Sequence, residues 1–224
     1  MNLIERLLGV IAPHNCLVCG DEGSLICDWC QPDAFMAIPS RCYRCRKATL
    51  DFRVCPSCRS QGQLTHVWTC TDYEKTAQDL VYKLKFDRAQ AAANLIAQYL
   101  DETLPYLKPE VLITFVPTVT NRVRQRGYDQ AELIAKAFAR RRGLRFARTL
   151  LRLGKSRQTG ARRHERLKQQ IGAFTAIRPY LYQKSTVLLI DDVLTTGATL
   201  QAAAAALKQA GIKQANAAVF TQTL

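Results

Sequence analysis

The chain has 224 residues, 48% of them hydrophobic, and 32 lysines and arginines against 18 acidic residues give a net charge of +14. This content supports a packed core and excludes a disordered polymer, and the length favours one ordinary domain plus a small appendage. No stretch approaches the roughly 18 to 20 apolar residues of a membrane helix, so we expect no membrane span.

The amino terminus predicts a short amphipathic helix. Residues 3–11 place apolar side chains at helical spacing around Glu5 and Arg6, without the small-residue cleavage site of a signal peptide. We expect this helix to dock on the rest of the chain or on a helicase-like protein partner.

Eight of the nine cysteines form four Cys-x-x-Cys pairs. A two-residue gap lets a tight turn aim two thiolates at one tetrahedral zinc ion, so eight thiols predict two structural zinc sites. Sequential pairing closes the shortest loops and is the arrangement we expect; an interleaved cross-brace is the alternative. The predicted ligands are Cys16, Cys19, Cys27 and Cys30 for one ion and Cys42, Cys45, Cys55 and Cys58 for the other.

Zinc-bound thiolates require a reducing compartment, which predicts a cytoplasmic protein. Redox chemistry at the paired cysteines is a weaker alternative. The ninth cysteine, Cys70, lies in an apolar run and is expected to be a buried small side chain. We expect His14 and His66 to be surface or packing residues, since eight thiols already satisfy two ions.

The cysteine-rich segment is too short to bury much apolar surface, so zinc is expected to supply its folding energy. We therefore predict a double zinc-ribbon module with its docking helix at residues 1–64 and a larger domain at residues 65–224.

The larger domain alternates apolar strand-like runs with helical segments. Helices are predicted at 75–86, 89–104, 128–142 and 198–210, and strands at 111–116, 145–153, 186–190 and 215–222. Continuous apolar strands alternating with helices predict an α/β fold with a parallel sheet covered on both faces. Ligands of such sheets bind beyond the carboxyl ends of the strands, and strand 186–190 ends there at Asp191 and Asp192.

The aspartates are followed by T-T-G-A-T at residues 195–199 and a helix start. Neither G-x-x-x-x-G-K-[ST] nor G-x-G-x-x-G occurs in this loop. Its small hydroxyl residues and backbone N–H groups can surround one phosphate, and the carboxylates can accept hydrogen bonds from ribose hydroxyls. The pattern indicates a ribose 5-phosphate site. The alternative is a capped strand and an ordinary turn, although paired carboxylates repel each other unless a ligand or metal is bound.

The stretch of four apolar residues, two acidic residues and V-L-T-T-G-A-T resembles the phosphoribosyl pyrophosphate (PRPP) motif of type I phosphoribosyltransferases. Together with the double zinc ribbon, it resembles the ComF family, whose members are implicated in natural competence and DNA uptake. The resemblance covers nearly the whole chain. It includes FVPTVTNRVRQRGYDQAELIA at 115–135 and KSRQTGARRHERL at 155–167. The resemblance implies a type I phosphoribosyltransferase-like sheet.

The resemblance also implies roles for individual residues. Asp191 and Asp192, the implied catalytic residues, would hold the 2- and 3-hydroxyls of the ribose. The 5-phosphate would lie on Thr195, Thr196, Gly197, Ala198 and Thr199. Pro117 and Thr118 would form the pyrophosphate loop, with pyrophosphate charge met by Lys85, Arg122, Arg126 and a bridging Mg²⁺. Residues 155–166 would close over the site, and Gln169 and Gln170 stand near the position where the family often has an asparagine.

The implied activity is that of a phosphoribosyltransferase, a pentosyl-transferring glycosyltransferase, acting in DNA uptake during transformation. Displacement at the ribose anomeric carbon would release pyrophosphate, and the acceptor is not specified by the sequence. The fold also resembles that of amidophosphoribosyltransferases, but their glutaminase domain is missing and Asn2 replaces the nucleophilic cysteine. Glutamine-dependent purine synthesis is therefore not expected.

A second hypothesis follows from the charge distribution. Between Arg122 and Lys168, 16 basic residues face 3 acidic ones. This window predicts an anionic partner, and single-stranded DNA could stack on Tyr43, Phe52 or Trp68. The alternative function is thus a non-catalytic single-stranded DNA-binding protein regulated by PRPP. The simplest alternative is a solvated basic surface.

Overall fold

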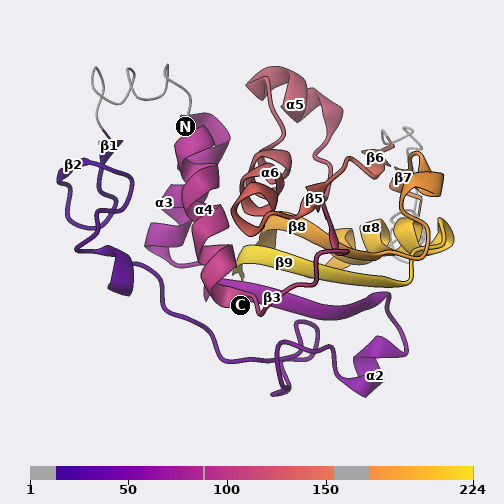
Figure 1. Ribbon diagram of the computed structural model, residues 1–224. Coiled ribbons are helices and arrows are strands. Elements are labelled where there is room, and N and C mark those ends of the chain that lie inside the picture. The colour runs from indigo at the N-terminus through magenta and orange to yellow at the C-terminus, as the bar shows by residue number, and fades with distance from the viewer. Residues whose placement is uncertain (1–13, 88, 154–171, 224) are drawn as a thin grey trace, which may run out of the picture.

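The computed structural model describes residues 14–87, 89–153 and 172–223. Its centre is a five-stranded sheet with the order β3-β9-β8-β4-β5, in which every neighbouring pair is parallel (Figure 1). The strands are β3 (Leu64–Asp72), β4 (Leu112–Phe115), β5 (Arg145–Phe146), β8 (Thr186–Leu194) and β9 (Gln214–Gln222). The predicted α/β fold with a parallel sheet is confirmed.

Helices cover both faces of the sheet. Three of them, α3 (Lys75–Phe86), α4 (Ala89–Thr103) and α6 (Gln130–Arg142), share one hydrophobic cluster with Leu188 and Ile190 of β8. On the other face, α8 (Ala198–Gln209) packs in a second cluster with Val187 and Leu189. Successive strand residues point to opposite faces, so an uninterrupted apolar run is what a strand buried on both faces requires.

Strand β8 is longer than predicted. The sequence suggested an end at residue 190, but β8 continues to Leu194 because β9 stays paired beside it, with Asp191 opposite Val219 and Leu194 opposite Gln222. The two aspartates therefore belong to the C-terminal part of strand β8 and not to the loop that follows it. Their backbones are fixed by the pairing.

The predicted strand at 145–153 is wrong as a single element. Only Arg145–Phe146 joins the main sheet, while β6 (Leu150–Arg152) forms a separate antiparallel pair with β7 (Phe174–Ala176). The chain turns between them at Thr149, which is fully buried and shares a 2.8 Å hydrogen bond with Thr114 of β4. After this break the chain enters the β6–β7 pair, to which Arg152 belongs.

One further helix lies between β4 and α6 in the chain. Helix α5 (Thr120–Arg126) was not predicted, and it ends at Gly127 with φ of 80°. Helix α6 begins at Gln130 and not at residue 128, because the Asp129 side chain caps it by accepting from the Ala131 N–H. A short 3₁₀ helix, η2 (Pro179–Leu181), precedes β8.

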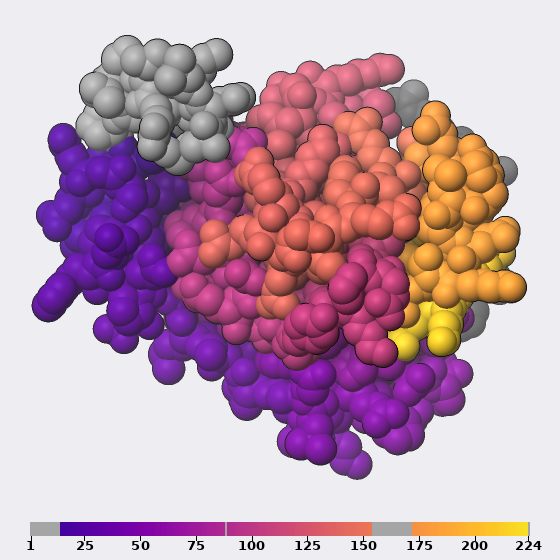
Figure 2. Space-filling model, in the orientation of Figure 1, coloured from indigo at the N-terminus to yellow at the C-terminus, as the bar shows by residue number. Residues whose placement is uncertain are grey.

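The cysteine-rich segment lies along one margin of this core. It contains β1 (His14–Asn15), β2 (Glu22–Gly23), the 3₁₀ helix η1 (Gln31–Asp33) and α2 (Pro56–Arg59). The space-filling view shows its indigo and purple residues along the left and lower margins (Figure 2). The predicted boundary at residue 64 coincides with the start of β3, and the division into two domains stays a prediction.

The predicted docking helix at residues 3–11 lies outside the described residues. Within the described ranges, no helix has both the length and the apolar character needed to cross a membrane.

Candidate functional site

The eight paired cysteines gather into two groups. Within each group, the ligand atoms all lie within 4.8 Å of one another: Cys16, Cys19, Cys27 and Cys30 in the first cluster, and Cys42, Cys45, Cys55 and Cys58 in the second cluster. This is the sequential arrangement predicted from loop length, and no interleaved group is formed by the described cysteines.

The geometry of both clusters fits zinc. The Sγ atoms of Cys19 and Cys27 are 3.7 Å apart and those of Cys45 and Cys55 are 3.5 Å apart. A tetrahedron with Zn–S bonds of about 2.3 Å has edges of about 3.8 Å. The Cys27 N–H also points at the Cys16 Sγ at 3.4 Å, as a donor to a thiolate would. Both clusters could therefore hold a zinc ion.

Local hydrogen bonds favour the thiolate form of Cys55 in the second cluster. The hydroxyl of Ser57 lies 3.3 Å from the Cys55 Sγ, and this contact, together with the Cys58 N–H, lowers the pKa of the Cys55 thiol to about 6. By contrast, burial raises the pKa of Cys70 to about 12, so this thiol stays protonated and unreactive, as its apolar setting predicted.

The Asp191–Asp192 pair stands at the carboxyl edge of β8. Each carboxylate uses its Oδ1 to accept the N–H of the following residue at 2.9 Å. The Asp192 side chain is only 9% exposed, and its Oδ2 faces the Lys85 Nζ at 3.0 Å. A carboxylate oxygen as buried as this one needs a cation or a hydroxyl group beside it.

The electrostatics of the pair are unfavourable without a ligand. Burial raises the pKa of Asp191 well above its ordinary value, and the charge of the neighbouring Asp192 carboxylate raises it further. Lys85 offsets the charge of the buried Asp192, whereas the half-buried Asp191 carboxylate beside it costs stability that a bound cation or hydroxyl pair would recover. This observation favours a ligand site over a simple strand cap.

Lys85 contacts the pair directly. Its Nζ lies 3.0 Å from the Asp192 Oδ2, at the end of α3. The sequence predicted that Lys85 meets pyrophosphate charge; in the structure its ammonium group neutralises Asp192. Its approach satisfies the charge of this oxygen but does not make a well-aligned hydrogen bond.

The predicted pyrophosphate loop is held by a carboxylate that the sequence analysis did not assign. Asp129 accepts the Thr118 N–H at 2.7 Å and the Thr118 hydroxyl at 3.2 Å, and it also caps α6. The Thr118 amide is therefore already used, and Pro117 has no N–H to offer. Asp129 could have been noticed as the acidic residue in the quoted R-G-Y-D-Q segment.

Arg152 is the second site residue without an assigned role. Its guanidinium donates to the Pro117 carbonyl at 3.4 Å, and it lies within electrostatic reach of Asp191, Asp129 and Arg122. Burial lowers the pKa of Arg152, and the Asp191 carboxylate opposes that change. Arg152 thus brings a positive charge from β6 to the carboxylate pair. Its only sequence signal was membership of the basic window.

The predicted phosphate loop begins helix α8. Gly197 is the N-cap residue with φ of 74°, and the Ala198 N–H donates to the Thr196 hydroxyl at 3.3 Å. Thr195 and Thr196 are exposed, whereas Gly197 is buried. Because the first N–H groups of a helix lack partners within it, this end of α8 can accept an anion.

Of the two arginines predicted for pyrophosphate, Arg122 lies exposed on α5 near Arg152. Arg126 is engaged elsewhere: its guanidinium lies 5.0 Å from the centre of the Phe86 ring and donates to Gln130 at 3.0 Å. The structure therefore brings Arg122 towards the site and holds Arg126 against α3.

Much of the described basic window is bound within the domain. Arg140 donates to Asn94, and Arg141 and Arg142 both pair with Asp101. Arg148 makes a two-pronged contact with Glu132, with both bonds at 2.8 Å. These four arginines already contact acidic or amide side chains of the domain, so they offer less charge to nucleic acid than their number in the sequence suggested.

The aromatic residues proposed for base stacking are also committed to packing. Tyr43 and Trp68 are 6% and 3% exposed, and the Trp68 Nε1 donates to Asp51 at 2.8 Å. Phe52 packs against the cluster that covers α3, α4 and α6. The hypothesis that Tyr43 and Trp68 stack on bases is therefore wrong, because neither ring is accessible.

Several predicted residues lie outside the described residues. They are the closing loop at 155–166, the amides of Gln169 and Gln170, and the window residues Lys155, Arg157, Arg162, Arg163 and Arg166.

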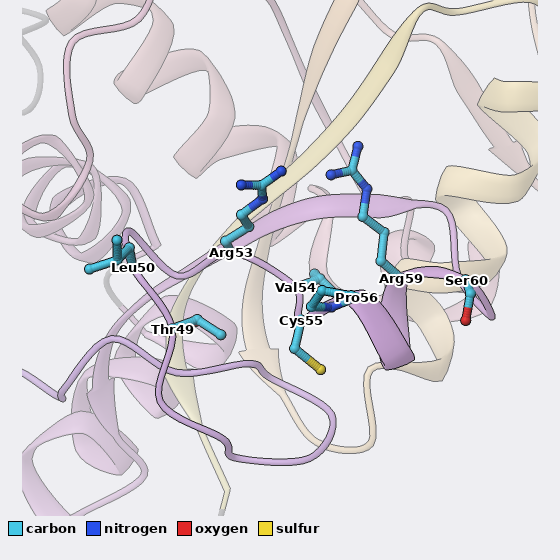
Figure 3. A pocket seen from close by; sticks show the side chains of 8 residues that line it. All are labelled: Thr49, Leu50, Arg53, Val54, Cys55, Pro56, Arg59 and Ser60. Atoms are coloured by element: carbon cyan, nitrogen blue, oxygen red, sulfur yellow. The ribbon is translucent and has the colours of Figure 1, made fainter.

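A cavity of about 620 Å³ lies beside the second cluster and is separate from the carboxylate pair. Arg53 and Arg59 extend to one side of it while Cys55 points to the other (Figure 3). None of the residues predicted to bind the phosphoribosyl group lines this cavity.

Comparison with known proteins places these features in context. A family model described as the phosphoribosyl transferase domain matches residues 137–223. Two curated relatives are named Competence protein ComFC. The one from Streptococcus pneumoniae is 25% identical over 212 residues, covering 93% of each chain, and the one from Bacillus subtilis is 26% identical over 234 residues, covering 92% of this chain and 93% of the relative.

A third relative, Competence protein F of Haemophilus influenzae, is 25% identical over 215 residues, which cover 84% of this chain and 93% of the relative. The resemblance to the ComF family is confirmed. Together with the matched domain, the parallel sheet gives a phosphoribosyltransferase-like α/β fold, and the two four-cysteine clusters near the N-terminus are consistent with zinc ribbons.

Two solved structures also align with 58% of this ComF-like chain. The allosteric regulatory enzyme of purine biosynthesis gives a TM-score of 0.42 at 17% identity, and the glutamine PRPP amidotransferase from Bacillus subtilis gives 0.43 at 18%. The aligned part spans 25% and 26% of those chains.

Proposed function

We propose that the chain binds PRPP or ribose 5-phosphate together with Mg²⁺ at the carboxyl edge of β8, and that it acts in DNA uptake during natural competence. The supporting observation is the placement of the Asp191–Asp192 pair beside Lys85 and just before the start of α8, where burial and the Asp192 carboxylate raise the pKa of Asp191. The competence role is supported by the names of the relatives.

In this proposal, Asp191 and Asp192 accept hydrogen bonds from the ribose hydroxyls. The 5-phosphate lies at the start of α8, on the backbone N–H groups and hydroxyls of residues 195–199. Arg122 and Arg152 supply positive charge for the pyrophosphate. Mg²⁺ would neutralise further charge on the leaving group.

Two other predicted roles need a rearrangement. Lys85 would share its charge between Asp192 and the ligand, since the two already form an ion pair. The Thr118 amide would reach pyrophosphate only if Asp129 released it.

We further propose that the reaction, where it occurs, is a phosphoribosyl transfer. The bond between the anomeric carbon and pyrophosphate breaks, and an acceptor nucleophile forms the new bond and loses a proton. Positive charge on the sugar ring develops as pyrophosphate leaves, and the two carboxylates stand where they stabilise that charge. A pyrophosphate-release assay with PRPP over a panel of acceptors separates a transferase from a PRPP sensor.

The two cysteine clusters are proposed to hold two structural zinc ions, each stabilising its own pair of turns. The alternative of a DNA-binding protein without catalysis is less favoured, because four arginines of the basic window already contact the domain.

Thermal unfolding tests the proposed site. A ligand at about 100 times its Kd stabilises a protein by about 2.7 kcal/mol, which raises the Tm of a chain of this size by about 5 to 10 °C. We expect PRPP with Mg²⁺ to produce such a shift in the wild type and none in Asp191→Asn/Asp192→Asn.

The matched control is Glu22→Gln/Glu110→Gln. It removes two carboxylates from exposed positions in β2 and before β4, away from the carboxyl edge. It should keep the wild-type shift, and a wild type that does not respond to PRPP would refute the proposed site.

A further inference from the structure

The two cysteine clusters differ in how they join the rest of the chain. The first cluster has a small core of its own, formed by Cys16, Cys30 and their neighbours. The second cluster belongs to the hydrophobic cluster of α8: Cys42 and Cys55 are packed there with Leu194 and Leu200. Only the second cluster is therefore continuous with the core beneath the phosphate loop.

Tyr43, which directly follows a cysteine of the second cluster, contacts the centre of that loop. A Cβ atom placed on Gly197 would lie 2.4 Å from the Cε2 of the Tyr43 ring, so the ring fills the space where any other residue would carry its side chain. Gly197 also has φ of 74°, a conformation that favours glycine. The loop thus lies directly against the Cδ2 and Cε2 atoms of the Tyr43 ring.

The Tyr43 hydroxyl extends this contact into α8. It accepts a hydrogen bond from the Gln201 side chain, one turn along the helix, and the same side chain accepts the Gln63 N–H at 2.9 Å. Gln201 therefore contacts both the first turn of the second cluster, at Tyr43, and the chain that follows the cluster, at Gln63.

A third link reaches the strand that carries the aspartates. Arg46 donates to the Thr223 carbonyl at 2.9 Å, and the Thr223 N–H donates to the Leu194 carbonyl at 2.9 Å, where β8 ends. Within the cluster, Arg44 donates to the Cys58 carbonyl at 3.1 Å and so joins its two turns. The phosphate loop is thereby fixed at its start and at its centre.

We propose that Tyr43 is a positioning residue: it transmits the conformation of the second cluster to the 195–199 loop, so that metal binding at that cluster and ligand binding at the loop are linked. The turn that carries Tyr43 is held by thiolates around one ion, and such turns lose their main stabilisation without it. The first cluster has no equivalent contact with the loop among the described residues. The contact between Tyr43 and Gly197 is present in the ligand-free structure, whereas its link to PRPP binding rests on the proposed function.

Hydrogen exchange of the zinc-loaded full chain tests this proposal. We expect Tyr43→Ala to speed exchange of the 195–201 amides about 10-fold or more, because the loop loses its support and opens locally. Tyr43→Phe keeps the ring and loses only the hydroxyl bond, so it should remain close to the wild type. Tyr43→Leu keeps an apolar side chain and takes the place of the alanine variant should that one not fold.

Tyr99→Ala is the matched control. Tyr99 is similarly buried, at 8% exposed, and its hydroxyl donates to the Gln31 carbonyl, so it ties α4 to the first-cluster segment. This variant should lower the Tm but leave exchange at residues 195–201 and the PRPP Kd unchanged. Tyr43→Ala should weaken PRPP binding about 10-fold or more, equivalent to about 1.4 kcal/mol.

Wild-type exchange at residues 195–201 in both Tyr43→Ala and Tyr43→Leu would overturn the proposal, as would an equal acceleration in Tyr99→Ala. If exchange responds to Tyr43 as expected while the wild type binds no PRPP, the positioning role stands and the proposed function fails.

Discussion

Asp191 is the residue where function and stability conflict. Its pKa is raised by burial and by Asp192, so the folded state binds a proton more tightly than the unfolded chain does. Stability from this group is therefore greatest below the unfolded pKa of about 3.9 and falls as the pH rises through the folded pKa. Ionisation of Asp191 beside Asp192 therefore weakens the ligand-free protein.

Replacing Asp191 should therefore stabilise the ligand-free protein. We expect Asp191→Asn to raise the Tm at pH 7 by about 2 to 4 °C, the change that roughly 1 kcal/mol produces in a chain of this size. The gain should shrink as the pH is lowered and Asp191 becomes protonated. Melting curves between pH 5 and pH 8 measure this, and a lower Tm for the variant across that range would contradict it.

Asp129 combines two structural roles at one position. It caps α6 and holds both the N–H and the hydroxyl of Thr118, so its removal should free the loop at residues 117–118.

We expect Asp129→Ala to lower the free energy of unfolding by about 1 to 2 kcal/mol through loss of the cap. Asp129→Asn, which keeps an acceptor oxygen, should cost less. Urea unfolding of the two variants gives the comparison, and equal losses would show that the charge, and not the hydrogen bonds, stabilises this corner.

At the scale of elements, helix α8 and the second cluster meet in a close contact at Gly197. Gly197 meets two constraints, a positive φ and the ring of Tyr43, whereas Gly127 at the end of α5 has φ of 80° and nothing within 4 Å of its Cβ direction. Comparing substitutions at these two glycines therefore distinguishes the cost of the positive φ from the cost of a steric clash with the ring.

Gly127→Ala should cost about 1 to 2 kcal/mol, the price of a left-handed conformation for an L-residue. Gly197→Ala should cost a further 1 to 3 kcal/mol or so, since its methyl group meets the Tyr43 ring. Chemical denaturation of both variants and of Gly197→Ala/Tyr43→Ala checks this. The double variant should recover part of the extra stability that Gly197→Ala loses. If Gly197→Ala lost no more stability than Gly127→Ala, the result would argue against the ring contact.

The elements also show what sequence patterns can and cannot predict. The apolar run at residues 187–190 and the helical spacing at 75–86 are local signals, and the structure contains both elements. The extension of β8 to Leu194 depends on β9, and the break at Thr149 depends on Thr114, so both require partners distant in the chain.

In the candidate site, too, some features follow from local sequence and others from contacts between distant parts of the chain. The motif at residues 191–199 and the cysteine spacing are visible in sequence, and the two clusters form as spacing predicted. The Lys85–Asp192 ion pair, the Asp129 bridge to Thr118 and the Tyr43 contact with Gly197 are tertiary contacts, which no local pattern encodes.

For the whole molecule, the two clusters should make zinc part of the fold. We expect native mass spectrometry to find two zinc ions per chain. Cys16→Ser/Cys19→Ser should bind one ion and keep the PRPP response, because the first cluster has a core of its own. Loss of both ions or of the PRPP response in this variant would contradict independent clusters.

Calorimetric titration of PRPP into the zinc-loaded chain in the presence of Mg²⁺ tests the central claim most directly. The account predicts saturable binding at one site per chain, lost in Asp191→Asn/Asp192→Asn and retained in Glu22→Gln/Glu110→Gln. Absence of binding by the wild type, or unchanged binding by Asp191→Asn/Asp192→Asn, would contradict a phosphoribosyl site at the end of β8.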